Sequence, residues 1–138
     1  MNHRIIFLKL VFWIGALLDA IMLIPMLSPE AGGAMFGISN FHPGPEYRYA
    51  MGIGASLMAG WTALLVWAHR EPVARRGVLL LTTVPVVTGM IGANIYAGTS
   101  GLVPFGNLVP LFLLQGLLAV LFLTAYFVSR PAENSIAP

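Results

Sequence analysis

The sequence predicts an all-α integral membrane protein, a four-helix bundle that crosses the bilayer up-down-up-down. Of its 138 residues, 58% are hydrophobic and only 9% are charged, whereas an average soluble domain carries about 25% charged residues. So few charges cannot cover a globular surface in water, so lipid must surround most of the chain. Four apolar windows each reach the roughly 20 residues that a membrane helix needs. They are 5–27, 47–68, 77–96 and 108–128.

The basic residues predict the orientation of the bundle. Six of the seven fall on one side of a four-span layout, and only Arg48 falls on the other. The six are Arg4, Lys9, Arg70, Arg75, Arg76 and Arg130. Because cytoplasmic flanks carry an excess of Lys and Arg, we expect both termini in the cytoplasm. We expect a multi-pass protein of the bacterial inner (cytoplasmic) membrane, with the first apolar run retained as a span.

We expect a single transmembrane domain over 1–130, followed by a disordered tail over 131–138. The first connection holds a short interfacial helix over 29–36. Ser28 supplies its N-cap, Pro29 its first position and Glu30 a favourable acid in the first turn. Gly37 would end this helix.

Proline and cap residues predict features of the third and fourth spans. Pro85 cannot donate a backbone hydrogen bond and should distort the third span. Thr82 and Thr83, or Gly89, would accommodate that distortion. Asn107 is expected to cap the fourth helix.

Asp19 is the most informative residue, because it lies inside the first apolar window. A carboxylate near the bilayer centre costs roughly 2.5–3.5 kcal/mol on insertion scales. Such a residue is a functional-site hypothesis. Helical spacing puts it on one face with Phe12, Gly15, Ala16, Met22 and Leu23. Small residues mark helix contacts in membranes, so Asp19 should be a buried aspartate that faces the bundle interior.

The remaining polar side chains gather toward the extracytoplasmic half. The predicted polar cluster is Asp19, Arg48, Ser56, Asn94 and Gln115, and the predicted outer rim is His42, Tyr47, Tyr49 and Asn107. The inner half holds mainly aliphatic residues, glycine and threonine. The sequence therefore predicts a polar pocket that opens outward above a drier inner plug.

Asp19 has two interpretations at this stage. It binds a proton or a cationic ligand, or it is a structural group paired with Arg48, whose guanidinium suits a buried bidentate pair. Asn94 and Gln115 also have two interpretations: they form hydrogen bonds between helices, or they contact a ligand. Gly52, Ser56 and Gly60 form a small-residue stripe for packing within the monomer or in a dimer.

The sequence lacks the residues that several kinds of chemistry require. The chain has no cysteine, which removes thiolate and disulfide chemistry. His3, His42 and His69 flank the spans, so Ser56 has no base beside it and a haem has no paired axial histidines. We expect no catalytic residue, no cofactor, no metal and, with basic residues dispersed, no nucleic-acid partner.

Some segments give a loose resemblance to a known group. Pro29 follows the first span, and Ala-Met-Phe-Gly stands at 34–37. A glycine-rich second span, MGIGASLMAGWTALLVWA, precedes the basic hairpin HREPVARRG. The chain resembles small four-span bacterial inner-membrane proteins of the DoxX-like kind. The resemblance implies a compact left-handed bundle and no particular activity.

Three functions remain open from the sequence. The leading one is non-enzymatic: a pocket around Asp19 binds a partner membrane subunit or a small hydrophobic or cationic ligand. The second is a small proton-coupled transporter that works as an oligomer, such as a homodimer. The third is a membrane enzyme acting on a lipid or a quinone, with Tyr47, Tyr49 or His42 assisting Asp19.

Overall fold

The computed structural model describes residues 3–129, and this part of the chain forms a bundle of helices. The elements in chain order are α1 (His3–Leu27), α2 (Pro29–Phe36), α3 (Pro45–Arg70), α4 (Gly77–Leu81), the π-helical segment η1 (Thr82–Val87), α5 (Thr88–Thr99) and α6 (Phe105–Val128). The segments α4, η1 and α5 together make one continuous span, Gly77–Thr99. The tail expected to be disordered, 131–138, lies outside the described residues.

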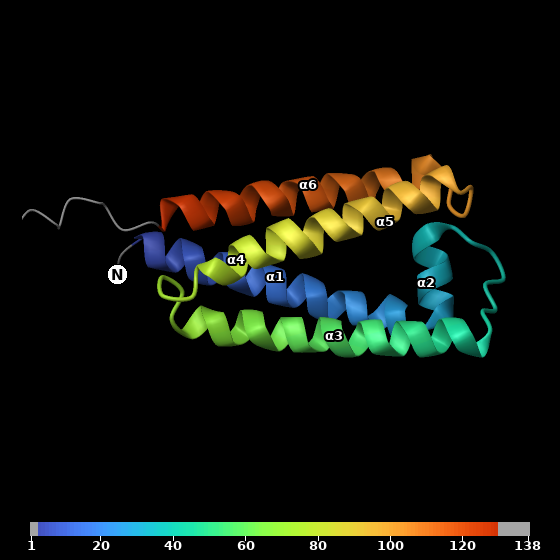
Figure 1. Ribbon diagram of the computed structural model, residues 1–138, viewed down its shortest axis with the longest axis horizontal. Helices are drawn as coiled ribbons and strands as arrows, with labels where there is room; N and C mark the ends of the chain where they lie inside the picture. Colours follow the sequence, from blue (N-terminus) through green and yellow to red (C-terminus); the bar gives the residue numbers. More distant parts are fainter. Residues whose placement is uncertain (1–2, 130–138) are drawn as a thin grey trace, which may run out of the picture.

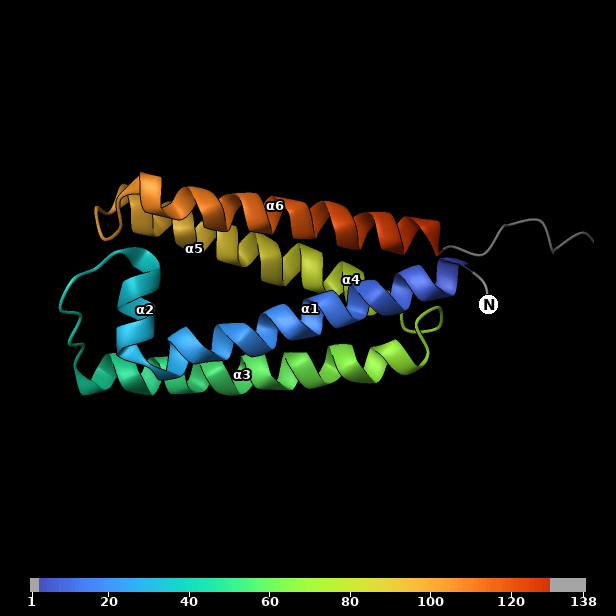
Figure 2. The same ribbon diagram turned by 180° about the vertical axis from the view of Figure 1, so that it is seen from behind.

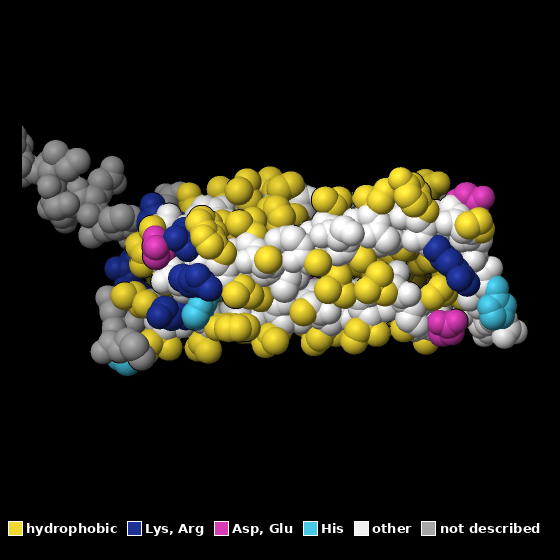
Figure 3. All heavy atoms as spheres, turned by 90° about the horizontal axis from the view of Figure 1, so that it is seen from below, with side chains coloured by type: hydrophobic (Ala, Val, Ile, Leu, Met, Phe, Trp, Pro, Cys, Tyr) yellow, Lys and Arg dark blue, Asp and Glu magenta, His cyan; other side chains and the backbone are white. Residues whose placement is uncertain are grey.

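Four of these helical segments are long and apolar enough to cross a membrane. All four windows predicted from the sequence fall inside them, so the prediction of a four-span membrane bundle is confirmed. In the face drawn in Figure 3, Lys and Arg gather at one end and a smaller mixed group of charges lies at the other. The band between them shows no charged side chain, as expected for a belt in contact with lipid.

The two ends of the bundle differ in how closely the helices approach. Figure 1 and the reverse view in Figure 2 show α1 crossing the bundle obliquely. At the end where the N-terminus lies, α1 runs close to α6, and toward the other end it lies along α3. The pair α5 and α6 diverges from the pair α1 and α3 toward that second end, where α2 lies crosswise between them. We call the first end the basic end and the second the open end.

A close-packed core fills the basic end. Its members are Leu8, Val11, Phe12, Ala16, Leu65, Ala68, Val78, Leu79, Phe122 and Ala125. Gly15 admits this packing, because an added Cβ would stand 3.0 Å from a ring carbon of Phe122 and 3.3 Å from Leu65. Small residues let membrane helices approach closely. The predicted interior face of the first helix is therefore the packing face.

The third span is distorted around Pro85, as predicted. The distortion takes the form of a π-helical turn over Thr82–Val87. A wider turn relieves the clash between the proline ring and the preceding carbonyl and absorbs its missing N–H. The hydroxyls of Thr82 and Thr83 donate to the Val78 and Leu79 carbonyls, at 2.8 and 2.9 Å. The Thr82 hydroxyl also accepts from Trp61 Nε1 at 3.1 Å, which ties α3 to this turn.

The short helix α2 has the bounds and caps that the sequence predicts. The Ser28 hydroxyl accepts from the Ala31 N–H at 3.3 Å. Gly37 ends the helix with φ at 70°, in the left-handed region that favours glycine. The N–H of Ile38 then donates to the Gly33 carbonyl at 2.8 Å. Local sequence signals therefore define this helix at both ends.

The prediction that Asn107 caps the fourth helix is wrong. The helix begins earlier, at Phe105, because Pro104 with its extended ψ of 135° already starts it. Asn107 therefore falls in the first turn, where its Nδ2 donates to the carbonyl of Phe36 at 2.9 Å. This bond satisfies a terminal carbonyl of α2 and fastens α2 to α6.

Replacing Asn107 with alanine should loosen α2 without unfolding the bundle. The lost side-chain bond is worth about 1 kcal/mol, so amides of residues 29–38 should exchange with deuterium faster. Hydrogen exchange measured by mass spectrometry in detergent checks this. Ser100→Ala is the control, because the Ser100 hydroxyl bonds only within its own turn, to the Ala97 carbonyl. Equal exchange in α2 of Asn107→Ala and the wild type would contradict the role of this bond.

Candidate functional site

Asp19 lies on the packing face of α1, about one helical turn beyond the buried Gly15 and Ala16. Its Oδ2 atom is enclosed and, within residues 3–129, accepts no hydrogen bond. The residue as a whole is only half-buried, so the expectation of a buried aspartate is wrong in that sense. Neighbours thus cover one carboxylate oxygen and not the whole side chain.

A small internal cavity of about 70 Å³ adjoins this carboxylate. Its walls come from α1, from the third span near its π-helical turn, and from α6. Asp19, Thr82 and Gln115 are its polar lining residues, and the rest of the wall is apolar. The volume holds roughly two water molecules at about 30 Å³ each. The space beside Asp19 therefore suits a small polar or ionic group.

Gln115 and Asn94 lie together and are hydrogen-bonded to each other. Gln115 is buried on α6, and its Oε1 accepts from Asn94 Nδ2 of α5 at 3.3 Å. Such bonds between membrane helices contribute on the order of 1 kcal/mol. This pair joins the last two helices, and Gln115 brings an amide to the Asp19 cavity.

Arg48 and Ser56 do not join that cluster. Arg48 is exposed near the start of α3 and lines a surface cavity of about 200 Å³ with Glu30 and Tyr47. Asp19 and Arg48 do not form an ion pair. The ion pair found among residues 3–129 joins Arg75 to Glu71. Asp19 lies roughly 12 Å along α1 before its end at the open side. Ser56 is exposed, and its hydroxyl bonds back to the Gly52 carbonyl of its own helix.

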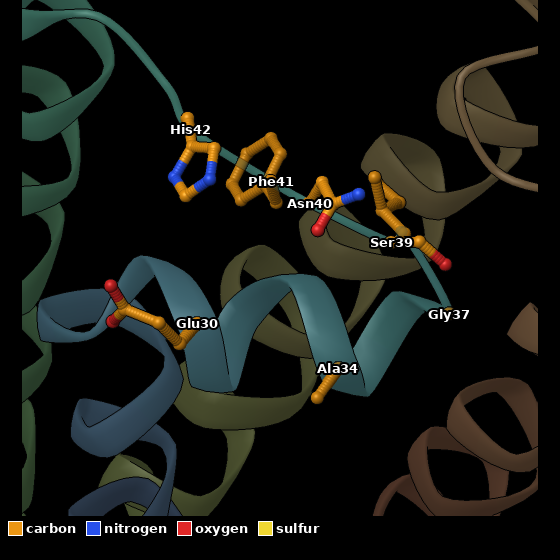
Figure 4. A pocket seen from close by; sticks show the side chains of 8 residues that line it. Glu30, Ala34, Gly37, Ser39, Asn40, Phe41 and His42 are labelled. Carbon is orange, nitrogen blue, oxygen red and sulfur yellow. The ribbon is translucent and has the colours of Figure 1, made fainter.

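The predicted outer rim occupies the open end, outside the Asp19 cavity. Figure 4 shows His42 facing Glu30 across a surface pocket between α2 and the following loop, with a volume of about 440 Å³. The backbone N–H of Glu30 and the Ser28 hydroxyl hold the pKa of the Glu30 carboxyl below its usual value. Tyr49 is exposed. Within the described residues, no three His, Asp or Glu side chains lie close enough to hold a metal ion.

A cavity that the sequence analysis missed, larger than the one beside Asp19, lies between α1, α2, α3 and α5. Its volume is about 340 Å³. Six methionines line it: Met22, Met26, Met35, Met51, Met58 and Met90. Pro25, Gly32, Phe36, Tyr47 and Ala93 complete the wall. We call it the methionine cavity. It adjoins the Asp19 cavity, because Met22 and Met90 line both.

A periodic signal for this cavity was present in the sequence. Met22 and Met26 are one helical turn apart, and Met51 and Met58 are two turns apart. Such spacings put each pair on one face of its helix. What the sequence could not give is that the two faces turn toward each other beneath α2.

Comparisons with protein-family models, with curated proteins and with solved structures find no match to this chain. The resemblance to DoxX-like proteins therefore rests on the quoted residues alone. The functional argument has to come from the site.

The structure predicts that Asp19 and Arg48 act independently on stability. Arg48→Gln should change the free energy of unfolding by no more than about 0.5 kcal/mol. The double variant with Asp19→Asn should show no coupling beyond about 0.5 kcal/mol. Equilibrium unfolding by sodium dodecyl sulfate in mixed micelles measures both quantities.

The Asn94–Gln115 pair serves as the positive control for this cycle, with an expected coupling of about 0.6–1.7 kcal/mol. A coupling of that size between Asp19 and Arg48 would restore the structural-pair interpretation.

Proposed function

We propose that this small polytopic membrane protein is a binding protein that takes a small cationic ligand through Asp19, without catalysing a reaction. The observation that carries the proposal is the enclosed Oδ2 of Asp19, which accepts no hydrogen bond from residues 3–129. Leaving a polar atom unsatisfied in an apolar interior costs about 1–3 kcal/mol, and more when it is charged.

A cation is the ligand that relieves this cost best. A wholly hydrophobic ligand or partner helix would leave the carboxylate oxygen unsatisfied. A positive charge within a few ångströms gains on the order of 4 kcal/mol in surroundings of intermediate polarity. Gln115 lines the same cavity and offers an amide for orientation.

The packing of the bundle supports entry from the open end. The core around Phe12 and Phe122 fills the basic end. The methionine cavity leads from α2 toward Met22 and Met90, which also line the Asp19 cavity. With the basic end in the cytoplasm, as the arginine distribution favours, the ligand would enter from the outer face of the inner membrane.

The enzyme interpretation lacks comparable support. Tyr47, Tyr49 and His42 do not line the cavity that Asp19 lines. No described acid or base therefore stands beside Asp19 to share proton transfer.

Asp19→Asn should weaken cation binding while the protein still folds. The probes are methylammonium, which can donate a hydrogen bond to the carboxylate, and Ag(I), each titrated calorimetrically into the detergent-solubilised protein in chloride-free buffer. We expect at least one to bind, and the Asn variant to bind it about tenfold or more weakly, equivalent to 1.4 kcal/mol. Glu46→Gln, at an exposed carboxyl on α3, should bind as the wild type does. Absence of binding by both probes, or equal affinity in Asp19→Asn, would refute the proposal.

A second candidate, an oligomeric transporter, is favoured by the stripe on α3. Gly52 and Gly60 have no described neighbour within 4 Å of an added Cβ, and Ser56 is exposed. The stripe therefore does not pack within the monomer and is free to meet a second copy. Close backbone approach is what small-xxx-small stripes permit.

Gly60→Ile should convert a dimer to a monomer if α3 forms the dimer contact. The bulky side chain blocks the approach of a second α3, and its Cβ would meet no described atom within 4 Å. Sedimentation equilibrium in detergent measures the association. Gly116→Ile is a matched control, since an added Cβ at Gly116 also meets no described atom within 4 Å. A wild type that stays monomeric, or a Gly60→Ile variant that stays dimeric, would exclude this contact.

A further inference from the structure

We propose that the methionine cavity is a binding site for a soft monovalent metal ion, Cu(I). The inference deepens the proposed function, because it names the class of cation held next to Asp19. The observation behind it is the gathering of thioethers from four helices around one cavity, with five of the six methionines half-buried and Met90 36% exposed.

The lining is selective for sulfur and not merely for apolar character. The chain has seven methionines, and all except Met1 line this cavity. Leucine, isoleucine and valine are abundant in the sequence, yet none of them lines the cavity. A pocket selected only for apolar contact would draw on these residues too. Their exclusion indicates that the thioether sulfur is the property that matters.

The cavity-lining methionines come from four different helical segments. Met22 and Met26 come from α1, Met35 from α2, Met51 and Met58 from α3, and Met90 from α5. Methionine is unbranched and has three rotatable side-chain bonds, so these side chains can converge without moving the helices.

The Met26 side chain of α1 lies close against the backbone of α3 at Gly54. An added Cβ at Gly54 would stand 2.8 Å from the terminal methyl of Met26. The bare backbone of α3 therefore makes room for the end of the Met26 side chain.

The ligand chemistry selects the ion. Thioethers are soft, neutral ligands that favour Cu(I) over divalent ions of harder character. Histidine, cysteine and carboxylate groups, which would hold zinc or manganese, are missing from the cavity wall. Aromatic Phe36 and Tyr47 at the wall add ring faces, which attract cations.

The charge of the ion needs a counter-charge, because neutral thioethers supply none. Burial of an uncompensated charge in an apolar interior is costly. Asp19 lies one helical turn before Met22, and its enclosed oxygen adjoins a cavity that shares Met22 and Met90 with the methionine cavity. The carboxylate is thus placed next to the site that a monovalent cation would occupy.

The experiment compares the full-length protein with methionine-to-leucine variants in detergent. Leucine preserves size and apolar character and removes only the sulfur. Cu(I) is supplied anaerobically with ascorbate as its complex with the chromogenic chelator bicinchoninate. We expect the wild type to withdraw Cu(I) stoichiometrically. The triple variant Met22→Leu, Met58→Leu, Met90→Leu should fail to compete, and the variant with all six replaced measures any background from Met1.

A second readout locates the ion. With methionine methyl groups labelled with ¹³C, addition of Ag(I), a redox-inert analogue, should shift the methyl resonances of cavity methionines and leave that of Met1 in place. Asp19→Asn should weaken Cu(I) affinity about tenfold, the lower range for loss of a supporting group at a metal site.

The outcomes separate this inference from the proposed function. Failure of the wild type to compete for Cu(I), or equal uptake by the six-leucine variant, would overturn the metal site. Binding of methylammonium that depends on Asp19, without Ag(I) binding, would keep the proposed function and reject the metal. Cu(I) binding that needs the methionines but not Asp19 would keep the metal site and reject the role of the carboxylate.

Discussion

Close packing of α1 against α3 and α6 sets the form of the rest of the bundle. Leu65 and Phe122 lie against the bare backbone of Gly15, and the core extends from there to the basic end. In lipid, the hydrophobic effect does not drive helices together, so such contacts decide where they meet. Asp19 follows this close-packed stretch, about one helical turn beyond the buried Gly15 and Ala16.

The divergence creates space that α2 closes. This helix lies crosswise at the open end, and the bond from Asn107 to the Phe36 carbonyl fastens it to α6. Beneath it, thioethers line the larger cavity, and the enclosed oxygen of Asp19 adjoins the smaller one. Flexible apolar side chains and a nearby negative charge together support the proposed cation site. Neither feature alone would identify a ligand class.

Local signals in the sequence predicted the local structure well. Hydropathy predicted the four spans, the caps at Ser28 and Gly37 predicted α2, and Pro85 predicted the distorted third span. The errors concern how helices face one another. Arg48 was grouped with Asp19 because both lie toward one side of the membrane, but their depths along the bundle differ.

The methionine cavity was missed for a related reason. Histidine, cysteine and carboxylate side chains are the residues usually recognised as metal ligands in a sequence. The cavity's methionines are scattered over four helices and form no such motif. The most direct test is anomalous diffraction from crystals grown with Cu(I), recorded at the copper absorption edge. The account predicts an anomalous peak between α1, α3 and α5, surrounded by methionine sulfurs and adjacent to Asp19. A methionine cavity filled by lipid or detergent density, with no anomalous peak, would contradict it.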